Sequence, residues 1–155
     1  MSRYIDVNIQ ELEDFKNRLE TLKDDLKTEF KDITSEVGTR VLNRTIEYTL
    51  FGIYDKPVDF VTKDGKHVQF TPHTGKMGGT LKRGWQGSLT SGTKNYVFKI
   101  QNPVYYAPYV EEGHRTVNGG FCDGAHMLRQ AVSETQPEFE QMIQTRIIDK
   151  IRSVF

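Results

Sequence analysis

The sequence Asn-Pro-Val-Tyr-Tyr-Ala-Pro-Tyr-Val-Glu-Glu-Gly, residues 102–113, decides how the two halves of this chain are joined. Pro103 and Pro108 each fix their own φ and push the preceding residue toward an extended conformation, so the stretch is not one uninterrupted helix. Gly113 can adopt the positive φ that ends a helix or forms a turn. We therefore predict a tightly specified corner between a strand and a loop.

The chain before this corner begins with a predicted long amphipathic helix. Asn8 and Glu11 have the spacing of a capping box, and Val7 and Leu12 that of a hydrophobic staple. We expect a break or bend in the segment 34–38, where β-branched residues and glycine lower helix propensity. The pattern favours a helix laid on a sheet over an intermolecular coiled coil, because no strict seven-residue repeat is sustained. The apolar stripe consists of Ile9, Leu12, Phe15, Leu19, Leu22, Leu26, Phe30, Ile33, Val37 and Val41.

Two β-hairpins are predicted between this helix and the corner. Residues 58–70 alternate apolar and polar around an Asp-Gly pair, which is a strong hairpin signal, and residues 85–101 form a second alternating pair of runs. Two glycine-rich stretches, Thr71 to Gly84 and His114 to Gly124, are predicted to be loops.

After the second loop, residues 125–155 are predicted to be helical. Pro137 interrupts this pattern, and Thr135 with Glu138 has the spacing of a second capping box, so we expect a kink or a restarted helix. The whole order predicts an α+β fold in which a long N-terminal helix and a C-terminal helix pack on one face of a small antiparallel sheet.

Composition limits the classes of protein that this chain can belong to. At 155 residues we expect a single domain spanning 1–155. Its 21 basic residues balance 21 acidic ones, so no overall charge favours nucleic acid or an anionic membrane. The single cysteine, Cys122, fits a reducing cytoplasm, and neither a signal peptide nor a membrane span is indicated.

The corner resembles the central motif of a family of phage tail-completion and head-to-tail joining proteins, a pattern of the form Asn-x-x-x-Tyr-Ala-x-Tyr-Val-Glu-x-Gly. The matching residues are Asn102, Tyr106, Ala107, Tyr109, Val110, Glu111 and Gly113. Upstream, Pro72, Thr74, Gly75, Leu81, Lys82 and Arg83 are similar to a second family segment, with residues 76–80 inserted and His73 where an acidic residue is usual. Downstream, Leu128 and Ala131 resemble the family's helix start.

The resemblance implies a virion structural protein, not an enzyme, that needs no cofactor. Such a protein completes the tail and helps join it to the head as a subunit of a six-membered ring, in an infectious phage or a prophage. The implied partners are the tail tube or tail terminator protein, the head-closure or connector protein, and further copies of the chain. The implied location is the tail or neck of the virion, after assembly in the host cytoplasm.

Six residues near the corner are candidates for a partner interface, since tyrosine, tryptophan and arginine are enriched at interface hot spots. The tyrosines can equally be half-buried anchors of the corner, and both interpretations can hold together. The candidates are Trp85, Tyr105, Tyr109, Glu111, His114 and Arg115.

Three basic residues, Lys76, Lys82 and Arg83, are clustered in the first glycine-rich loop. If this loop lines the channel of a ring, these residues would contact the phosphates of passing DNA without sequence preference.

The alternative from another class is a small metal-dependent hydrolase or nuclease that uses His114, Cys122 and His126, with Asp123 beside them. Zinc sites usually pair their ligands at short fixed spacings, and only Cys122 and His126 come close to one, so we predict no metal site. A third hypothesis is an adaptor that binds one partner helix along the N-terminal apolar stripe.

Overall fold

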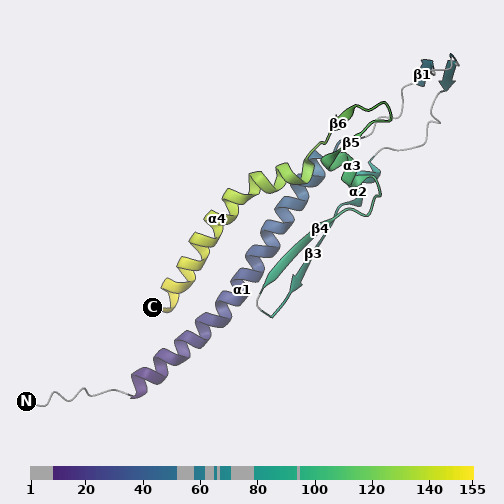
Figure 1. Cartoon of the computed structure of the whole chain (residues 1–155). Coiled ribbons are helices and arrows are strands. Elements are labelled where there is room, and N and C mark those ends of the chain that lie inside the picture. Colours follow the sequence, from purple (N-terminus) through teal and green to yellow (C-terminus); the bar gives the residue numbers. More distant parts are fainter. Residues whose placement is uncertain (1–8, 52–57, 62–64, 66, 71–78, 94) are drawn as a thin grey trace, which may run out of the picture.

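The computed structural model describes residues 9–51, 58–61, 65, 67–70, 79–93 and 95–155. Within these ranges, helices and two-stranded antiparallel hairpins alternate along the chain (Figure 1). The predicted helix-start residues Asn8 and Val7, and Lys76 of the basic cluster, lie outside the described residues.

The N-terminal helix, α1, is the scaffold of the fold. It runs from Ile9 to Tyr48 without interruption, so the predicted break at residues 34–38 does not occur. Gly38 is instead a contact point: a Cβ there would lie 2.0 Å from Cγ of Phe98. The glycine therefore lets a strand approach the helix backbone closely, and packing outweighs its low helix propensity.

The hairpin that reaches Gly38 is formed by β3 (Gln86–Ser91) and β4 (Tyr96–Gln101), as the alternation predicted. Leu89 is opposite Phe98 in the ladder, and Gly87 is opposite Ile100. The Phe98 ring fills the space beside both Gly38 and Gly87, since a Cβ on Gly87 would also lie within 3 Å of it. The first predicted hairpin is present too, as β1 (Val58–Val61) paired with β2 (His67–Phe70).

The C-terminal helix, α4, runs from Met127 to Val154 and packs along α1 in the opposite direction. It continues through Pro137 and does not restart there, although its first turns run at an angle to the rest in Figure 1. In the same view α1 lies between α4 and the β3–β4 hairpin. The predicted α+β class, with long N- and C-terminal helices and a small antiparallel sheet, is confirmed.

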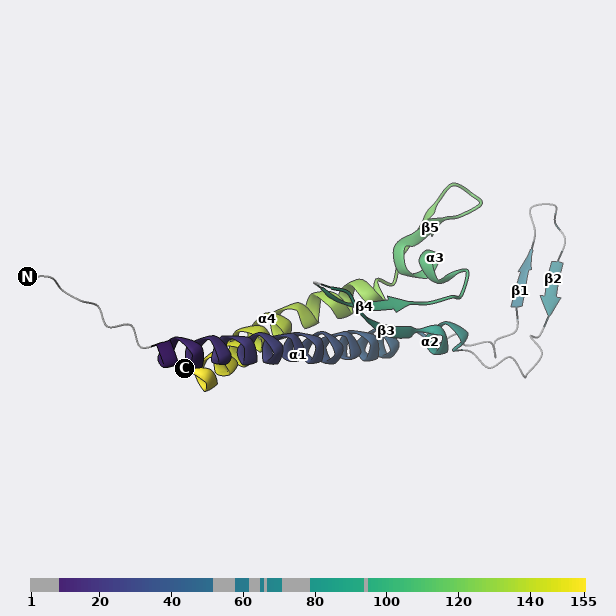
Figure 2. The same ribbon diagram turned by 90° about the horizontal axis from the view of Figure 1, so that it is seen from below.

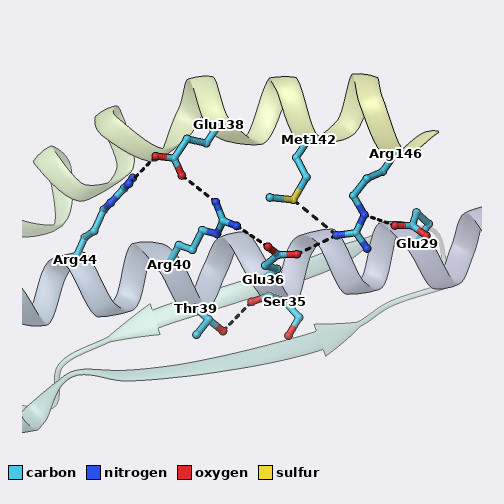
Figure 3. Close-up of polar contacts among 9 residues, drawn as sticks. All are labelled: Glu29, Ser35, Glu36, Thr39, Arg40, Arg44, Glu138, Met142 and Arg146. Carbon is cyan, nitrogen blue, oxygen red and sulfur yellow. Dashed lines mark hydrogen bonds and ion pairs between the residues drawn. The ribbon is translucent and has the colours of Figure 1, made fainter. Parts of the chain in front are cut away.

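An ion-pair network aligns the two long helices (Figure 3). Glu138 of α4 accepts hydrogen bonds from Arg44 at 2.5 Å and from Arg40 at 3.2 Å, and Arg40 also contacts Glu36. Arg146 of α4 then joins Glu36 to Glu29. The hydrogen bond from Arg44 is the main cause that lowers the pKa of Glu138 below its ordinary value.

A third hairpin, β5 (Gly113–Arg115) with β6 (Phe121–Asp123), occupies the stretch that was predicted to be a loop. Its turn contains Asn118-Gly119, and Gly119 has a φ of 82°. An Asn-Gly pair is the usual signal of a tight hairpin turn, so the sequence itself indicates this hairpin.

An apolar cluster lies where the corner meets α1. Its buried residues are Leu81, Trp85, Ala107 and Met127, with partly buried residues of α1 and the corner around them. Other buried apolar residues lie on the two long helices: Leu22, Ile33 and Val41 of α1 and Ala131 of α4. The indole N–H of Trp85 donates to the hydroxyl of Thr49 at 2.8 Å, so the buried ring keeps its polar atom paired. The apolar cluster fixes the corner against the end of α1.

Candidate functional site

Asn102 ties the beginning of the corner to the rest of the chain. Its side-chain amide donates to the carbonyl of Leu81, in the short helix α2 (Thr80–Gly84), at 2.8 Å. Its side-chain oxygen accepts from the backbone N–H of Val104 at 3.1 Å. One amide thus links α2 to the turn that follows β4, which explains the asparagine at this motif position.

Glu111 ties the end of the corner to α4. It lies in the short helix α3 (Ala107–Glu112), and its carboxylate accepts the backbone N–H groups of Leu128 at 3.1 Å and Arg129 at 3.0 Å. These donors belong to the first turn of α4, which has no local side-chain cap. A carboxylate at this end of a helix pairs otherwise orphan donors and complements the helix dipole.

Two of the six predicted interface residues are therefore in the interior. Glu111 and Trp85 are each only 9% exposed, and both side chains are hydrogen-bonded inside the chain. This is a correction to their predicted role at a partner surface. Both side chains are buried because Glu111 caps the start of α4 and the Trp85 ring packs in the apolar cluster.

Gly113 shows how closely the chain is packed where α3 passes into β5. Its φ is 87°, as the corner pattern predicted, and a Cβ there would lie 2.5 Å from the carbonyl oxygen of Cys122. Gly124 makes a similar close approach from the other side, against the carbonyl of Glu111. The backbone of the corner is held rigidly against the third hairpin.

The other predicted tyrosines are on the surface of this rigid corner. Tyr105 is 85% exposed and Tyr109 is 58% exposed. The Tyr105 ring packs edge-on against Tyr106, with centroids 5.2 Å apart, and the Tyr109 ring lies 6.4 Å from the exposed His114. The structure thus brings Tyr109 and His114 together as an exposed pair, with Tyr105 displayed on the same corner.

Arg115 is exposed in β5, but successive strand residues point to opposite faces, so it is directed away from His114. Its partner across the ladder is Phe121, which is 63% exposed. The sequence analysis missed Phe121 as a surface aromatic. The hairpin signal at Asn118-Gly119 would have placed it beside Arg115.

The remaining basic residues of the predicted cluster are in α2. Lys82 is half-buried and Arg83 is exposed, and both lie in the last turn of this five-residue helix. The structure therefore places two of the three predicted cations next to each other, close to the buried Leu81 of the core.

The four residues of the alternative metal site are all described, and they do not converge. Among the described residues, no group of three or more His, Cys, Asp or Glu side chains is arranged to hold a metal ion. His114 and Cys122 are opposite each other in the third hairpin, whereas His126 lies at the start of α4 with a φ of 49°. Cys122 is exposed.

Comparisons of the chain with family models, with curated proteins and with solved structures found no match. In the parts of the chain that the structure describes, there is no helix with the length and apolarity to cross a membrane.

Proposed function

We propose that this chain is a virion structural protein that completes a phage tail and helps join it to the head. It acts as a ring subunit through protein–protein contacts with the tail tube or terminator protein, the head-closure or connector protein and further copies of itself. The protein assembles in the host cytoplasm and ends in the tail or neck of the particle.

The observation that carries this proposal is that some residues of 102–113 hold the corner in place while others are exposed on its surface. Asn102, Ala107, Glu111 and Gly113 of the motif hold the corner in place by hydrogen bonds, burial and a positive φ. Between them, the motif displays Tyr109, with Tyr105 beside it. Rigid, exposed aromatic side chains are well suited to bind a protein partner, because little conformational entropy is lost on binding.

Exposed apolar side chains also support a role in assembly. Large apolar side chains are exposed on both long helices and on the third hairpin, for instance Leu12 at 55%, Val132 at 48% and Phe121 at 63%. Contiguous exposed apolar patches mark interaction sites in soluble proteins, and the exposed rings of Phe15 and Phe155 contact each other. None of the corner residues has the hydrogen-bonded arrangement of a nucleophile and a base.

Deleting the gene from its parent phage or prophage tests the proposal. Negative-stain electron microscopy of the lysate should show DNA-filled heads separate from tails that are unfinished or of abnormal length. Normal joined particles in the deletion strain would contradict the proposal.

Complementation then tests the corner itself. A gene carrying Tyr105→Ala and Tyr109→Ala should fail to restore joined particles, whereas Val97→Ala should restore them, because Val97 is an exposed apolar residue of β4 away from the corner. The circular dichroism of the purified double variant should match that of the wild type. Full complementation by the double variant would show that the tyrosines are not part of the joining interface.

A further inference from the structure

The first turns of α1 extend beyond the end of α4 and beyond the β3–β4 hairpin (Figures 1 and 2). Three apolar residues in this part are exposed: Ile9 at 71%, Leu12 at 55% and Leu19 at 43%. Leu12 and Leu19 are seven residues apart and so lie on the same side of the helix. Phe15, whose ring contacts that of Phe155, connects this stripe to the C-terminal end of α4.

A row of charges borders the apolar stripe. Glu13, Lys16, Glu20 and Lys23 recur at spacings of three, four and three, so they share one side of α1, and their signs alternate. None of the four forms an ion pair with another residue in the described part of the chain. By contrast, the neighbouring Lys27 is paired with Asp24 at 3.0 Å. Alternating charges beside an apolar stripe are typical of a helix that packs against another helix.

The order of these four charges indicates which partner helix could pack against this part of α1. Read from one end the signs are minus, plus, minus, plus, and read from the other end they are plus, minus, plus, minus. Two identical helices therefore place opposite charges against each other when they run antiparallel, and like charges when they run parallel in register. An antiparallel arrangement of two copies is closed and isologous.

We propose that the N-terminal half of α1 pairs with the same segment of a second copy of this chain, antiparallel and about a two-fold axis near residue 18. This register places Glu13 opposite Lys23 of the second copy, and Lys16 opposite Glu20. Leu19 lies beside the axis and meets its own counterpart, and Leu12 lies near Leu26 of the second copy. The two helices overlap over residues 9–27, a length of about 28 Å.

The fold limits this overlap, and within it the end of α4 already lies along α1 at Phe15 and Asp25. Ile9 of the second copy falls opposite Lys27, where the tip of the β3–β4 hairpin begins. There a cavity of about 530 Å³ is lined by Lys27, Phe30, Thr34, Gly92, Thr93, Asn95 and Tyr96. The hairpin blocks any longer overlap on this side, and Phe30 and Tyr96 offer apolar surface to the end of the incoming helix. The pairing uses α1 and leaves the corner free, so it is independent of the tail role.

Charge reversal tests both the partner and the register. Sedimentation of the full chain at low salt, at about 1 to about 200 µM, should show a reversible monomer–dimer equilibrium that weakens as salt is added. Lys16→Glu and Glu20→Lys should each weaken dimerisation about tenfold, since two like-charge contacts replace two ion pairs. An equimolar mixture of these two variants should form heterodimers with wild-type affinity, because every contact between them is again between opposite charges.

Lys31→Glu is the matched control. It reverses an exposed charge on α1 outside the overlap, so it should leave dimerisation unchanged. Circular dichroism of each variant separates loss of pairing from loss of folding. A wild-type chain that stays monomeric at every concentration overturns the proposal. So does a mixture of Lys16→Glu and Glu20→Lys that associates no better than either variant alone, in which case the stripe fits a different partner.

Discussion

At the scale of one residue, the carboxylate of Glu111 caps the start of α4 instead of lying at a partner surface. Its two oxygens accept one backbone N–H each from consecutive residues of α4, seventeen and eighteen positions along the chain. The neighbouring Glu112 is exposed, and its carboxylate lies 3.6 Å from the guanidinium group of Arg129, which is also exposed. Of the two adjacent carboxylates, Glu111 therefore caps a helix, whereas Glu112 belongs to an exposed ion pair.

We predict that Glu111→Ala destabilises the fold by about 2 kcal/mol, because it leaves two backbone donors at the start of α4 without a partner. Urea denaturation measures the change in the free energy of unfolding. Glu112→Ala is the control, and should change stability by less than about 0.5 kcal/mol. If the two substitutions lower the free energy of unfolding equally, the hydrogen bonds of Glu111 to α4 make no specific contribution to stability.

Gly38 is the second residue whose role depends on a distant contact. Gly38→Ala improves helix propensity by roughly 1 kcal/mol, but the new methyl group overlaps the base of the Phe98 ring, which cannot move without displacing β4. We expect a net loss of about 1–2 kcal/mol in the free energy of unfolding, measured with urea. In a Phe98→Ala background the same substitution should be neutral or stabilising, and an unchanged penalty there would rule out the ring as its cause.

At the scale of elements, the ion-pair network holds α4 in register on α1 (Figure 3). Hydrogen bonds from Arg44 and Arg40 lower the pKa of Glu138, and the same contacts raise the pKa of both guanidinium groups. A second contact of the same helices, from the Tyr48 hydroxyl to Glu134, lowers the pKa of that carboxyl and raises the pKa of Tyr48. The helices are therefore matched by charged and polar residues along their seam as well as by apolar packing.

Glu138→Gln should lower the melting temperature at neutral pH by no more than about 4 °C, because the pairs are partly open to solvent. The pKa of Glu138 is lower in the folded state, so its stabilisation is complete above the unfolded pKa of about 4.3. It is lost as pH falls below that value, through the folded pKa. The difference between the two proteins should therefore vanish in acid.

Glu140→Gln is the control for this measurement, because Glu140 lies on the same helix and accepts a hydrogen bond from Gln136 alone among the described residues. A gap between wild type and Glu138→Gln that persists in acid would mean that packing, and not charge, explains the effect.

At the scale of the whole molecule, the corner lies near the C-terminal end of α1, and the first turns of α1 lie at the opposite end, where Phe15 contacts Phe155 (Figure 2). The two proposed interaction surfaces, the aromatic corner and the first turns of α1, are at opposite ends of α1. If both proposals hold, this separation would let one chain bind two partners at once.

The basic cluster is tested at this scale, in the assembled particle. If Lys76, Lys82 and Arg83 face the DNA channel of a ring, replacing all three by glutamine should slow DNA ejection several-fold, since the contacts are electrostatic and independent of sequence. A fluorescence assay of released DNA measures the rate, with Lys31→Gln as the control. Failure of head–tail joining with normal DNA release would assign the cluster to a protein interface.

Sequence reasoning succeeded where the signal is local. The apolar stripe from Ile9 to Val41 predicted α1, and the alternation over residues 85–101 predicted the β3–β4 hairpin. It failed where a contact between distant segments overrides local preference, as at Gly38. At Pro137 we expected a kink or a restarted helix; α4 does not restart there, and its first turns run at an angle to the rest (Figure 1). The stretch from His114 to Gly124 was predicted to be a loop and forms the third hairpin, although Asn118-Gly119 is a local signal for a hairpin turn.

The sequence by itself determined the class of the fold, the positions of the long helices and the corner at residues 102–113, because periodicity, proline and glycine act on neighbouring residues. Only the tertiary structure decided which corner residues are exposed. Within residues 102–113, Glu111 is buried while Tyr105 and Tyr109 are exposed, although all three are polar or aromatic residues of the same short stretch. The reason is that burial depends on what α4 and the end of α1 bring to the corner, and those partners come from distant parts of the chain.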